Sequence, residues 1–107
     1  MTVAQFDVYR NPSSTTRRFY PYLVDIQSHY LEDLATRIVI PLGKASCFGD
    51  AAMKGLTPEV SFQGEKLLLL IPQISSIPRK RLKEPVGSML HLRDEVLAAL
   101  DFAIAGI

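Results

Sequence analysis

The sequence predicts one small domain that is mainly β and ends in an α-helix, an α+β or small-barrel architecture. Three patterns predict it: an alternating N-terminal segment, a tight hairpin around Gln63-Gly64, and a helical period that begins near Ser88. With 107 residues, 48% of them hydrophobic and 21% charged, the chain suits a single globular domain over residues 1–107. We therefore expect five to seven strands followed by one helix.

The first two strands are predicted on either side of a polar loop. In Val3–Tyr9, alternation places an apolar set on one face and Tyr9 with the polar residues on the other, as in a strand with one buried side. The polar segment 10–18 is typical of an exposed hairpin loop. Tyr20–Gln27 is rich in aromatic and β-branched residues, and Pro21 is expected at the start or edge of this second strand.

The middle of the chain contains one clear strand and two ambiguous stretches. Arg37–Leu42 is almost continuously apolar, which favours a strand buried on both faces, and Pro41 is expected to end its central pairing. Ser28–Thr36 fits a turn or a short helical excursion. Gly43–Gly55 fits either a loop or a pair of short accessory strands, and the pattern does not choose between them.

The clearest hairpin joins Thr57–Phe62 to Glu65–Ile71 through Gln63-Gly64. The turn type is open, because Gln is less usual than Asn or Asp at the first of these positions. Ile74–Ile77 is expected to add a short strand before Pro78.

From Ser88 onward the apolar residues repeat at three and four, which predicts a helix with one apolar stripe: Leu92, Val96, Ala99, Leu100, Ala103 and Ile107. Ser88 is the expected N-cap, and Gly106 is the expected place for the helix to fray. After Arg93 every charge is negative, although a helix C-terminus favours cations. Either an arginine elsewhere in the fold supplies the cation, or a partner supplies it and docks on the apolar tip 104–107.

The residues with reactive side chains do not form a recognisable catalytic or metal motif. Cys47 is the only cysteine and fits a small buried hydrophobe better than a nucleophile. His29 and His91 lack metal-ligand spacing with each other or with Cys47, so no metal or cofactor is predicted. Asp25 lies inside an apolar strand, and we favour a strand-edge charge or a pair with an arginine such as Arg37 over a catalytic role.

The charge balance, 12 Lys and Arg against 11 Asp and Glu, argues against a nucleic-acid partner. The densest basic cluster is Arg79-Lys80-Arg81 with Lys83, either a solvated face or a landing patch for an acidic protein segment. The longest apolar run, Leu67–Pro72, is too short to span a membrane, and Met1–Tyr9 does not read as a signal peptide. We therefore expect a cytoplasmic protein without a membrane partner.

Several segments together resemble the CcdB family, the toxins of CcdA/CcdB toxin–antitoxin modules. They are Gln5–Tyr9 (QFDVY), Leu23–Ser28 (LVDIQS), Arg37–Leu42 (RIVIPL), Ser75–Pro78 (SSIP) and the closing Gly106-Ile107. From Tyr22 onward they keep the family's relative spacing, and the N-terminal loop around Ser13–Thr16 is a few residues longer. The resemblance covers essentially the whole chain. It implies a homodimer with an SH3-like barrel of the CcdB/MazF type, a small accessory sheet in the region of Gly43–Gly55 and a C-terminal helix.

The resemblance also implies an activity. Toxins of this family are not enzymes; they bind the A subunit of DNA gyrase and trap the cleaved gyrase–DNA complex. A CcdA-like antitoxin neutralises them by wrapping a disordered segment over the toxin. The basic residues Arg79, Lys80 and Arg81 are candidates for antitoxin contact.

Carried over position by position, the gyrase-facing residues of the family fall on Tyr30, Leu31, Asp101, Ile104, Ala105, Gly106 and Ile107. Three of them depart from the family pattern. Ala105 stands where the family has tryptophan, Ile104 where it usually has phenylalanine, and Asp101 where it has asparagine. Aromatic anchors of this kind commonly contribute about 2 kcal/mol or more at an interface, so the loss of the tryptophan predicts an affinity roughly 30-fold lower.

Two other functions are weighed against gyrase poisoning. One is a dimer that binds antitoxin but has lost the poison, which the absence of tryptophan motivates. The other is a ribonuclease of the MazF/Kid type, because those toxins share the barrel; however, His29, His91 and the arginines show no acid–base spacing that supports RNA hydrolysis.

Overall fold

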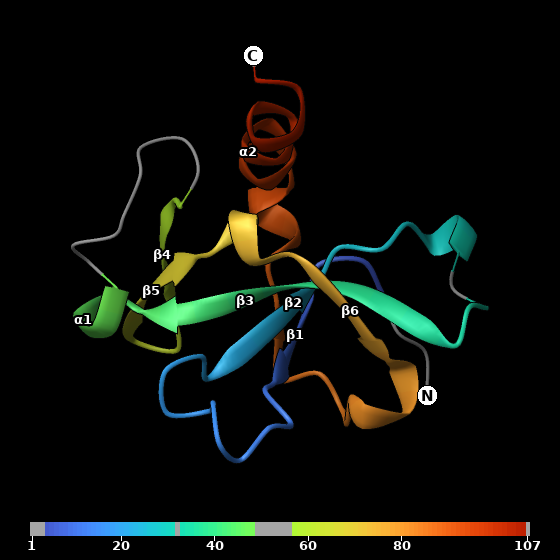
Figure 1. Ribbon diagram of the computed structural model, residues 1–107, viewed down its shortest axis with the longest axis horizontal. Coiled ribbons are helices and arrows are strands. Elements are labelled where there is room, and N and C mark those ends of the chain that lie inside the picture. Colours follow the sequence, from blue (N-terminus) through green and yellow to red (C-terminus); the bar gives the residue numbers. More distant parts are fainter. Residues whose placement is uncertain (1–3, 32, 49–56, 107) are drawn as a thin grey trace.

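One curled antiparallel sheet carries a C-terminal helix that rises from one of its faces (Figure 1). The computed structural model describes residues 4–31, 33–48 and 57–106. Its sheet has seven strands in the order β4-β5-β3-β2-β1-β7, and β6 also pairs with β3. The mainly β class with a C-terminal helix and a barrel-like sheet is confirmed.

The first hairpin joins β1 (Asp7–Arg10) to β2 (Tyr22–Asp25), with Val8 opposite Val24. Pro21 directly precedes β2, as predicted. The buried side chain of Asn11 organises the connecting loop by donating to Thr16 Oγ1 and to the carbonyl of Tyr20, at 3.0 and 2.8 Å. The polar loop is therefore held by an internal network.

The alternating pattern of Val3–Tyr9 predicted two features of the first strand wrongly: the residue at which it begins, and the exposure of the face that carries Tyr9. Phe6 has a φ of +70°, in the left-handed region, so regular pairing starts only at Asp7. Tyr9, expected on the polar face, is fully buried. It packs in a second apolar cluster with Leu23, Val39 and Leu82 on the other side of the sheet.

The longest strand, β3 (Thr36–Lys44), runs through Pro41, which was expected to end its central pairing. Pairing with β2 continues through Leu23 opposite Pro41 to Tyr22 opposite Leu42. The prediction is wrong because of where the proline nitrogen points. The carbonyl of Pro41 accepts from Leu70 N at 3.0 Å, and within one residue of a strand the carbonyl and the nitrogen face the same neighbour. On that side the partner changes from β6 to β5, so the missing N–H interrupts no regular ladder.

The predicted second hairpin is confirmed as β4 (Glu59–Phe62) and β5 (Glu65–Leu69). Gln63 and Gly64 both have positive φ, +50° and +79°, which identifies a type I′ turn. The predicted short strand is β6 (Ser75–Pro78), and β7 (Gly87–Ser88) pairs with β1. Between β5 and β6 lies the 3-10 turn η3 (Ile71–Gln73), and η4 (Arg79–Arg81) follows β6.

The two ambiguous stretches adopt local turns where they are described. Within Ser28–Thr36 the chain forms the 3-10 turn η1 (His29–Leu31) before β3 begins. Within Gly43–Gly55, β3 ends at Lys44 and a single helical turn, α1 (Ala45–Phe48), follows; residues 49–56 lie outside the described residues. Cys47, expected to be buried, is exposed on α1.

The C-terminal helix, α2 (Arg93–Ala105), follows a 3-10 turn, η5 (Leu90–Leu92). The prediction that Ser88 caps this helix is wrong, because Ser88 is the last residue of β7 and pairs with Asp7. Its hydroxyl instead accepts from the backbone N–H of Leu90 at 3.2 Å, at the start of η5. Asp94 and Glu95 do lie in the first turn of α2, where the helix dipole favours them.

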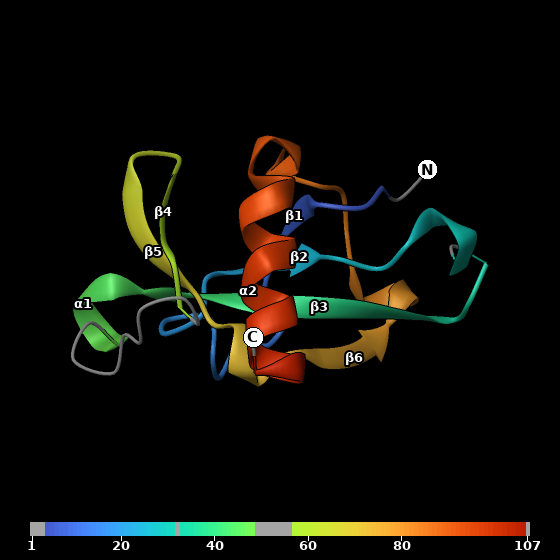
Figure 2. The same ribbon diagram turned by 90° about the horizontal axis from the view of Figure 1, so that it is seen from above.

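The sheet buries a different set of side chains on each face. The helix-side face, which α2 covers, is an apolar core that includes Phe6, Val24, Ile40 and Leu67, together with Val96 of the helix. The opposite face carries the smaller cluster around Tyr9. Seen from above, α2 crosses the strands of the sheet (Figure 2). No helix in the described part of the chain is long and apolar enough to cross a membrane.

Candidate functional site

The helix α2 is buried at its beginning and exposed at its end. Val96 and Ala99 belong to the core, at 1% and 6% exposure, whereas Ile104 is 80% exposed. Every residue from Asp101 to Gly106 is exposed, so the last turns of the helix stand clear of the sheet (Figure 1). We call residues 101–106 the helix tip.

A glycine cap ends the helix tip. Gly106 has a φ of +73°, and its N–H donates to the carbonyl of Phe102 at 3.0 Å, an αL cap that ends the helix after Ala105. A side chain at position 106 meets no atom within 4 Å, so the backbone conformation alone favours glycine there. The structure thus places Asp101, Ile104, Ala105 and Gly106 on one exposed element, while Ile107 lies outside the described residues.

An apolar groove of about 390 Å³ runs between the helix tip and η3. Its walls include Ile74 and Phe102, which are 41% and 44% exposed. Sequence reasoning missed both residues. The available signal was that Phe102 is a large apolar side chain outside the predicted stripe, which a core-packing helix does not need.

The other predicted contact residues lie on η1. Tyr30 is 86% exposed and Leu31 is 45% exposed, and the ring of His29 lies against that of Tyr30 with centroids 4.2 Å apart. Ser28 starts this turn: its hydroxyl accepts from Tyr30 N at 3.2 Å and its carbonyl accepts from Leu31 N at 2.9 Å. The turn therefore presents two large side chains to solvent.

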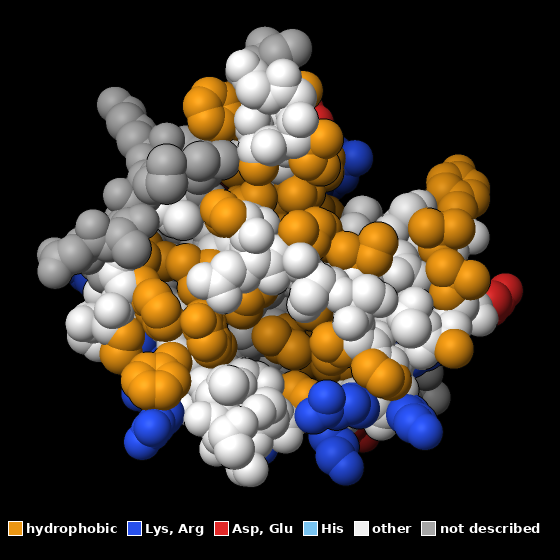
Figure 3. Space-filling view, in the orientation of Figure 1, with side chains coloured by type: hydrophobic (Ala, Val, Ile, Leu, Met, Phe, Trp, Pro, Cys, Tyr) orange, Lys and Arg blue, Asp and Glu red, His pale blue; other side chains and the backbone are white. Residues whose placement is uncertain are grey.

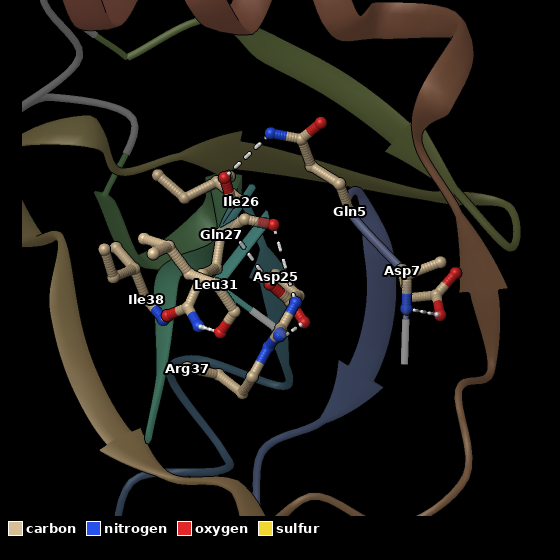
Figure 4. Close-up of polar contacts among 9 residues, drawn as sticks. Gln5, Asp7, Asp25, Ile26, Gln27, Leu31, Arg37 and Ile38 are labelled. Atoms are coloured by element: carbon tan, nitrogen blue, oxygen red, sulfur yellow. Dashed lines mark hydrogen bonds and ion pairs between the residues drawn. The ribbon is translucent and has the colours of Figure 1, made fainter. Parts of the chain in front are cut away.

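A buried polar network lies beneath this turn (Figure 4). The Nε of Arg37 donates to Asp25 Oδ2 at 2.7 Å, and both side chains are fully buried. The interpretation of Asp25 as the partner of Arg37 is confirmed. Burial raises the pKa of the Asp25 carboxyl, while the hydrogen bonds from Arg37 and from the backbone N–H of Gln27 oppose that shift.

Tyr9 lies on the same face of the sheet. Burial, helped by the negative charges of Asp7 and Asp25, raises the pKa of its hydroxyl to about 12. Within the described parts of the chain, neither Tyr9 Oη nor Arg37 Nη1 has a hydrogen-bond partner. Enclosed in this way, the pair of Asp25 and Arg37 does not present groups to a substrate.

The helix tip and η1 do not lie next to each other within one chain. Figure 1 and Figure 2 both show the turn displaced to the side of the helix. The structure therefore places those predicted gyrase-facing residues that it describes in two separate exposed groups.

The basic run forms η4 at the opposite edge of the molecule from the helix tip. Lys80, Arg81 and Lys83 are exposed and Arg79 is half-buried. Figure 3 shows Lys and Arg side chains gathered along this lower edge, while hydrophobic side chains gather above it. A groove of about 250 Å³ lies beside Arg81, lined by Leu23, Pro41 and Ile77 among others.

The described residues offer little support for metal or acid–base chemistry. Across residues 4–31, 33–48 and 57–106, no three His, Cys, Asp or Glu side chains gather in a way that holds a metal ion. His29 and His91 lie on the separate turns η1 and η5. The exposed groups are suited to binding another macromolecule through apolar and basic surfaces.

A comparison with protein families identifies a family for this chain. The model of the CcdB protein family matches residues 5–106, nearly the whole chain. The match spans both hairpins, η1, η4 and the helix tip. The chain therefore belongs to the CcdB family of toxins.

Proposed function

We propose that this protein is the toxin of a type II toxin–antitoxin pair, that it acts as a homodimer on the A subunit of DNA gyrase, and that a CcdA-like antitoxin neutralises it. It acts by binding and inhibiting or poisoning gyrase, and not as an enzyme. The observation that carries the proposal is the helix tip: six successive exposed residues that include Ile104, at 80% exposure, in a chain matched by the CcdB family over residues 5–106.

The helix tip supports gyrase binding by its shape and chemistry. Interface residues that contribute most are large side chains that lose water on binding, and Ile104 and Phe102 are two such groups already held on a rigid helix. Asp101 adds a carboxylate that can pair with an arginine of the partner, although an exposed pair contributes only about 0–1 kcal/mol. The groove beside Phe102 offers a second apolar surface, suited to contact with another copy of the chain.

The basic turn supports antitoxin binding. Lys80 and Arg81 are exposed cations next to a groove with apolar walls, which suits a segment that carries both acidic and apolar side chains. Charges of this kind mainly speed encounter and set the register of the complex. Neutralising Lys80 and Arg81 is expected to slow antitoxin association most strongly at low salt.

The direct test is a gyrase cleavage assay with the enzyme of the native host. The wild-type protein is expected to trap cleaved DNA, and Ile104→Asp to reduce this about 10-fold or more because a charge replaces the apolar anchor. Ala98→Asp is the matched control, since Ala98 is exposed on the same helix but outside the helix tip. If wild-type protein binds no gyrase and traps no cleaved DNA, the proposal fails.

A second candidate function is supported by Ala105: a dimer that binds antitoxin and does not poison gyrase. Position 105 is exposed on the helix tip but carries only a methyl group, and the chain has no tryptophan. In this case Ala105→Trp is expected to create toxicity, while Ala98→Trp, the same change away from the helix tip, is not. A lethal unmodified protein would contradict this second function.

A further inference from the structure

We propose that Gln27 is a positioning residue, whose side-chain amide fixes the turn that presents Tyr30 and Leu31 to the partner. The proposal rests on the proposed function for its partner, but the positioning itself stands on the contacts of Gln27. Gln27 is only 2% exposed, so it does not contact the partner itself and acts through the turn above it.

Every hydrogen-bonding group of Gln27 is used. Its side-chain Nε2 donates to the carbonyl of Leu31 at 2.7 Å, and its Oε1 accepts from Ile38 N at 3.0 Å (Figure 4). Its backbone N–H donates to Asp25 Oδ1 at 2.9 Å, and its carbonyl accepts from Arg37 Nη2 at 3.5 Å. One side chain thus connects the turn to β3, and the buried ion pair holds the backbone from which that side chain projects.

The bond to Ile38 shows how the chain leaves the sheet. In a regular antiparallel ladder, every second pair of facing residues exchanges two backbone bonds. Ile26 N does donate to Ile38 O at 2.9 Å, but the return bond is absent: Ile38 N donates to the Gln27 side chain, and Ile26 O accepts from Gln5 Nε2 at 3.0 Å. The amide of Gln27 therefore takes the place of a peptide group, which frees the backbone to turn away after residue 27.

The bond to Leu31 fixes the far end of the same turn. The carbonyl of Leu31 accepts from Gln27 Nε2 and also from Leu34 N, the latter at 3.1 Å. Because Tyr30 is 86% exposed and lies next to Leu31, its own packing does little to define its position. Ser28 holds the start of the turn, and the buried amide of Gln27 holds its far end, so the geometry of this surface depends on both.

Two substitutions separate the bonds. Gln27→Glu, compared at a pH where its carboxyl is ionised, keeps an acceptor for Ile38 N but replaces the donor to Leu31 with a carboxylate oxygen, which only accepts. Gln27→Met keeps the length of the side chain and removes both bonds. Leu67→Ala is the stability control, because Leu67 is fully buried on β5 and pairs with β3 at Lys44, at the end of that strand remote from η1.

The first measurement is amide hydrogen exchange of the folded proteins, which needs no partner. Faster exchange of Leu31 and Leu34, about 10-fold or more, is expected in both Gln27 variants, with core amides of β5 changed no more than in Leu67→Ala. Unchanged exchange at Leu31 and Leu34 in both variants would overturn the proposal.

The second measurement is the dissociation constant for the gyrase A subunit, taken well below the melting temperature of every variant. A Kd raised about 10-fold or more in both Gln27 variants, and near wild type in Leu67→Ala, is the expected result. Equal Kd values for the Gln27 variants and Leu67→Ala would overturn the role in presentation. If wild-type protein binds no gyrase A, the proposed function fails, and hydrogen exchange alone decides the positioning role.

Discussion

The two faces of the sheet are stabilised by different chemistry. On the helix-side face a large apolar cluster forms the core, and Val96 and Ala99 of α2 complete its packing. On the opposite face a fully buried ion pair, Asp25 with Arg37, lies among a few apolar side chains. Removing one apolar side chain from a core costs stability in proportion to the cavity that is left. Removing one member of a buried ion pair leaves the other charge buried without a partner. The opposite face is therefore the more sensitive one, and it is the face that holds η1 in place.

The largest effect is expected from breaking the ion pair. Arg37→Met leaves the Asp25 carboxylate buried without a cation, and we expect the free energy of unfolding to fall by about 3–5 kcal/mol at pH 7. Because burial raises the pKa of Asp25 and no guanidinium now opposes this, the folded variant takes up a proton as the pH falls. Urea denaturation is therefore expected to give a smaller loss of unfolding free energy, relative to wild type, at pH 4 than at pH 7.

The double variant Asp25→Asn with Arg37→Met is the control for that experiment. Asn keeps an acceptor for the backbone N–H of Gln27 and carries no charge, so much of the lost stability is expected to return. A double variant as unstable as Arg37→Met would show that the charge imbalance is not the cause.

The second-largest loss of stability is expected on the helix-side face. Leu67→Ala removes a fully buried side chain from the helix-side face, and a loss of about 2–4 kcal/mol is expected from the cavity. No charged group in that cluster changes its pKa, so the deficit should be the same at pH 4 and pH 7. A deficit that varies with pH as strongly as that of Arg37→Met would remove the distinction between the two faces.

Alkaline pH probes the opposite face through Tyr9. An ordinary tyrosine releases its proton near pH 10.0, whereas the folded state holds that of Tyr9 up to about pH 12. The folded state thus binds more protons in this range, so the free energy of unfolding falls as the pH rises from 10 to 12, by about 2 kcal/mol. Tyr9→Phe is expected to abolish this part of the pH dependence. It should also raise stability by about 1 kcal/mol at pH 7, because a buried hydroxyl without a partner is removed.

Tyr30→Phe is the matched control, since Tyr30 is 86% exposed. Equilibrium denaturation at pH 10, 11 and 12 makes the comparison. Parallel pH profiles for wild type and Tyr9→Phe would contradict the buried position of the hydroxyl.

The smallest effect is expected at the helix tip, which belongs to neither face. Gly106→Ala places a side chain at a φ of +73°, at a local cost of about 1 kcal/mol. Because Gly106 is exposed at the very end of the helix, the cost should appear as fraying of the last turn, with the amide of residue 106 exchanging about 5-fold faster and the melting temperature nearly unchanged. Gly106→Asn should fray less, since Asn tolerates this conformation better. A fall of several degrees in melting temperature would show that the helix tip contributes to the core.

The features that sequence predicted well depend on short-range signals. The hairpin at Gln63-Gly64 and the helical stripe through Val96 and Ala99 each follow from residues a few positions apart. The pairing of Asp25 with Arg37 was one of the two alternatives that the sequence predicted for this charge, the other being a position at a strand edge.

The features that sequence missed depend on long-range pairing. Ser88 has the chemistry of an N-cap, but pairing with Asp7 of β1 places it in a strand. Pro41 interrupts nothing only because β3 changes partner at that position. The role of Gln27 was invisible for the same reason, since its bond to Ile38 joins two strands across a loop. Its buried position between η1 and β3 cannot be read from the local pattern.

At the exposed end of α2, the residues available for partner binding differ from the residues that stabilise the fold. Substitutions of the exposed side chains at Asp101, Ile104 and Ala105 change what the molecule touches and cost little folding free energy, whereas Phe102 is more than half covered. Ala105, where the resemblance to the CcdB family implies a tryptophan, is exposed on this element, so under the proposed function a change there alters target binding and leaves the scaffold intact.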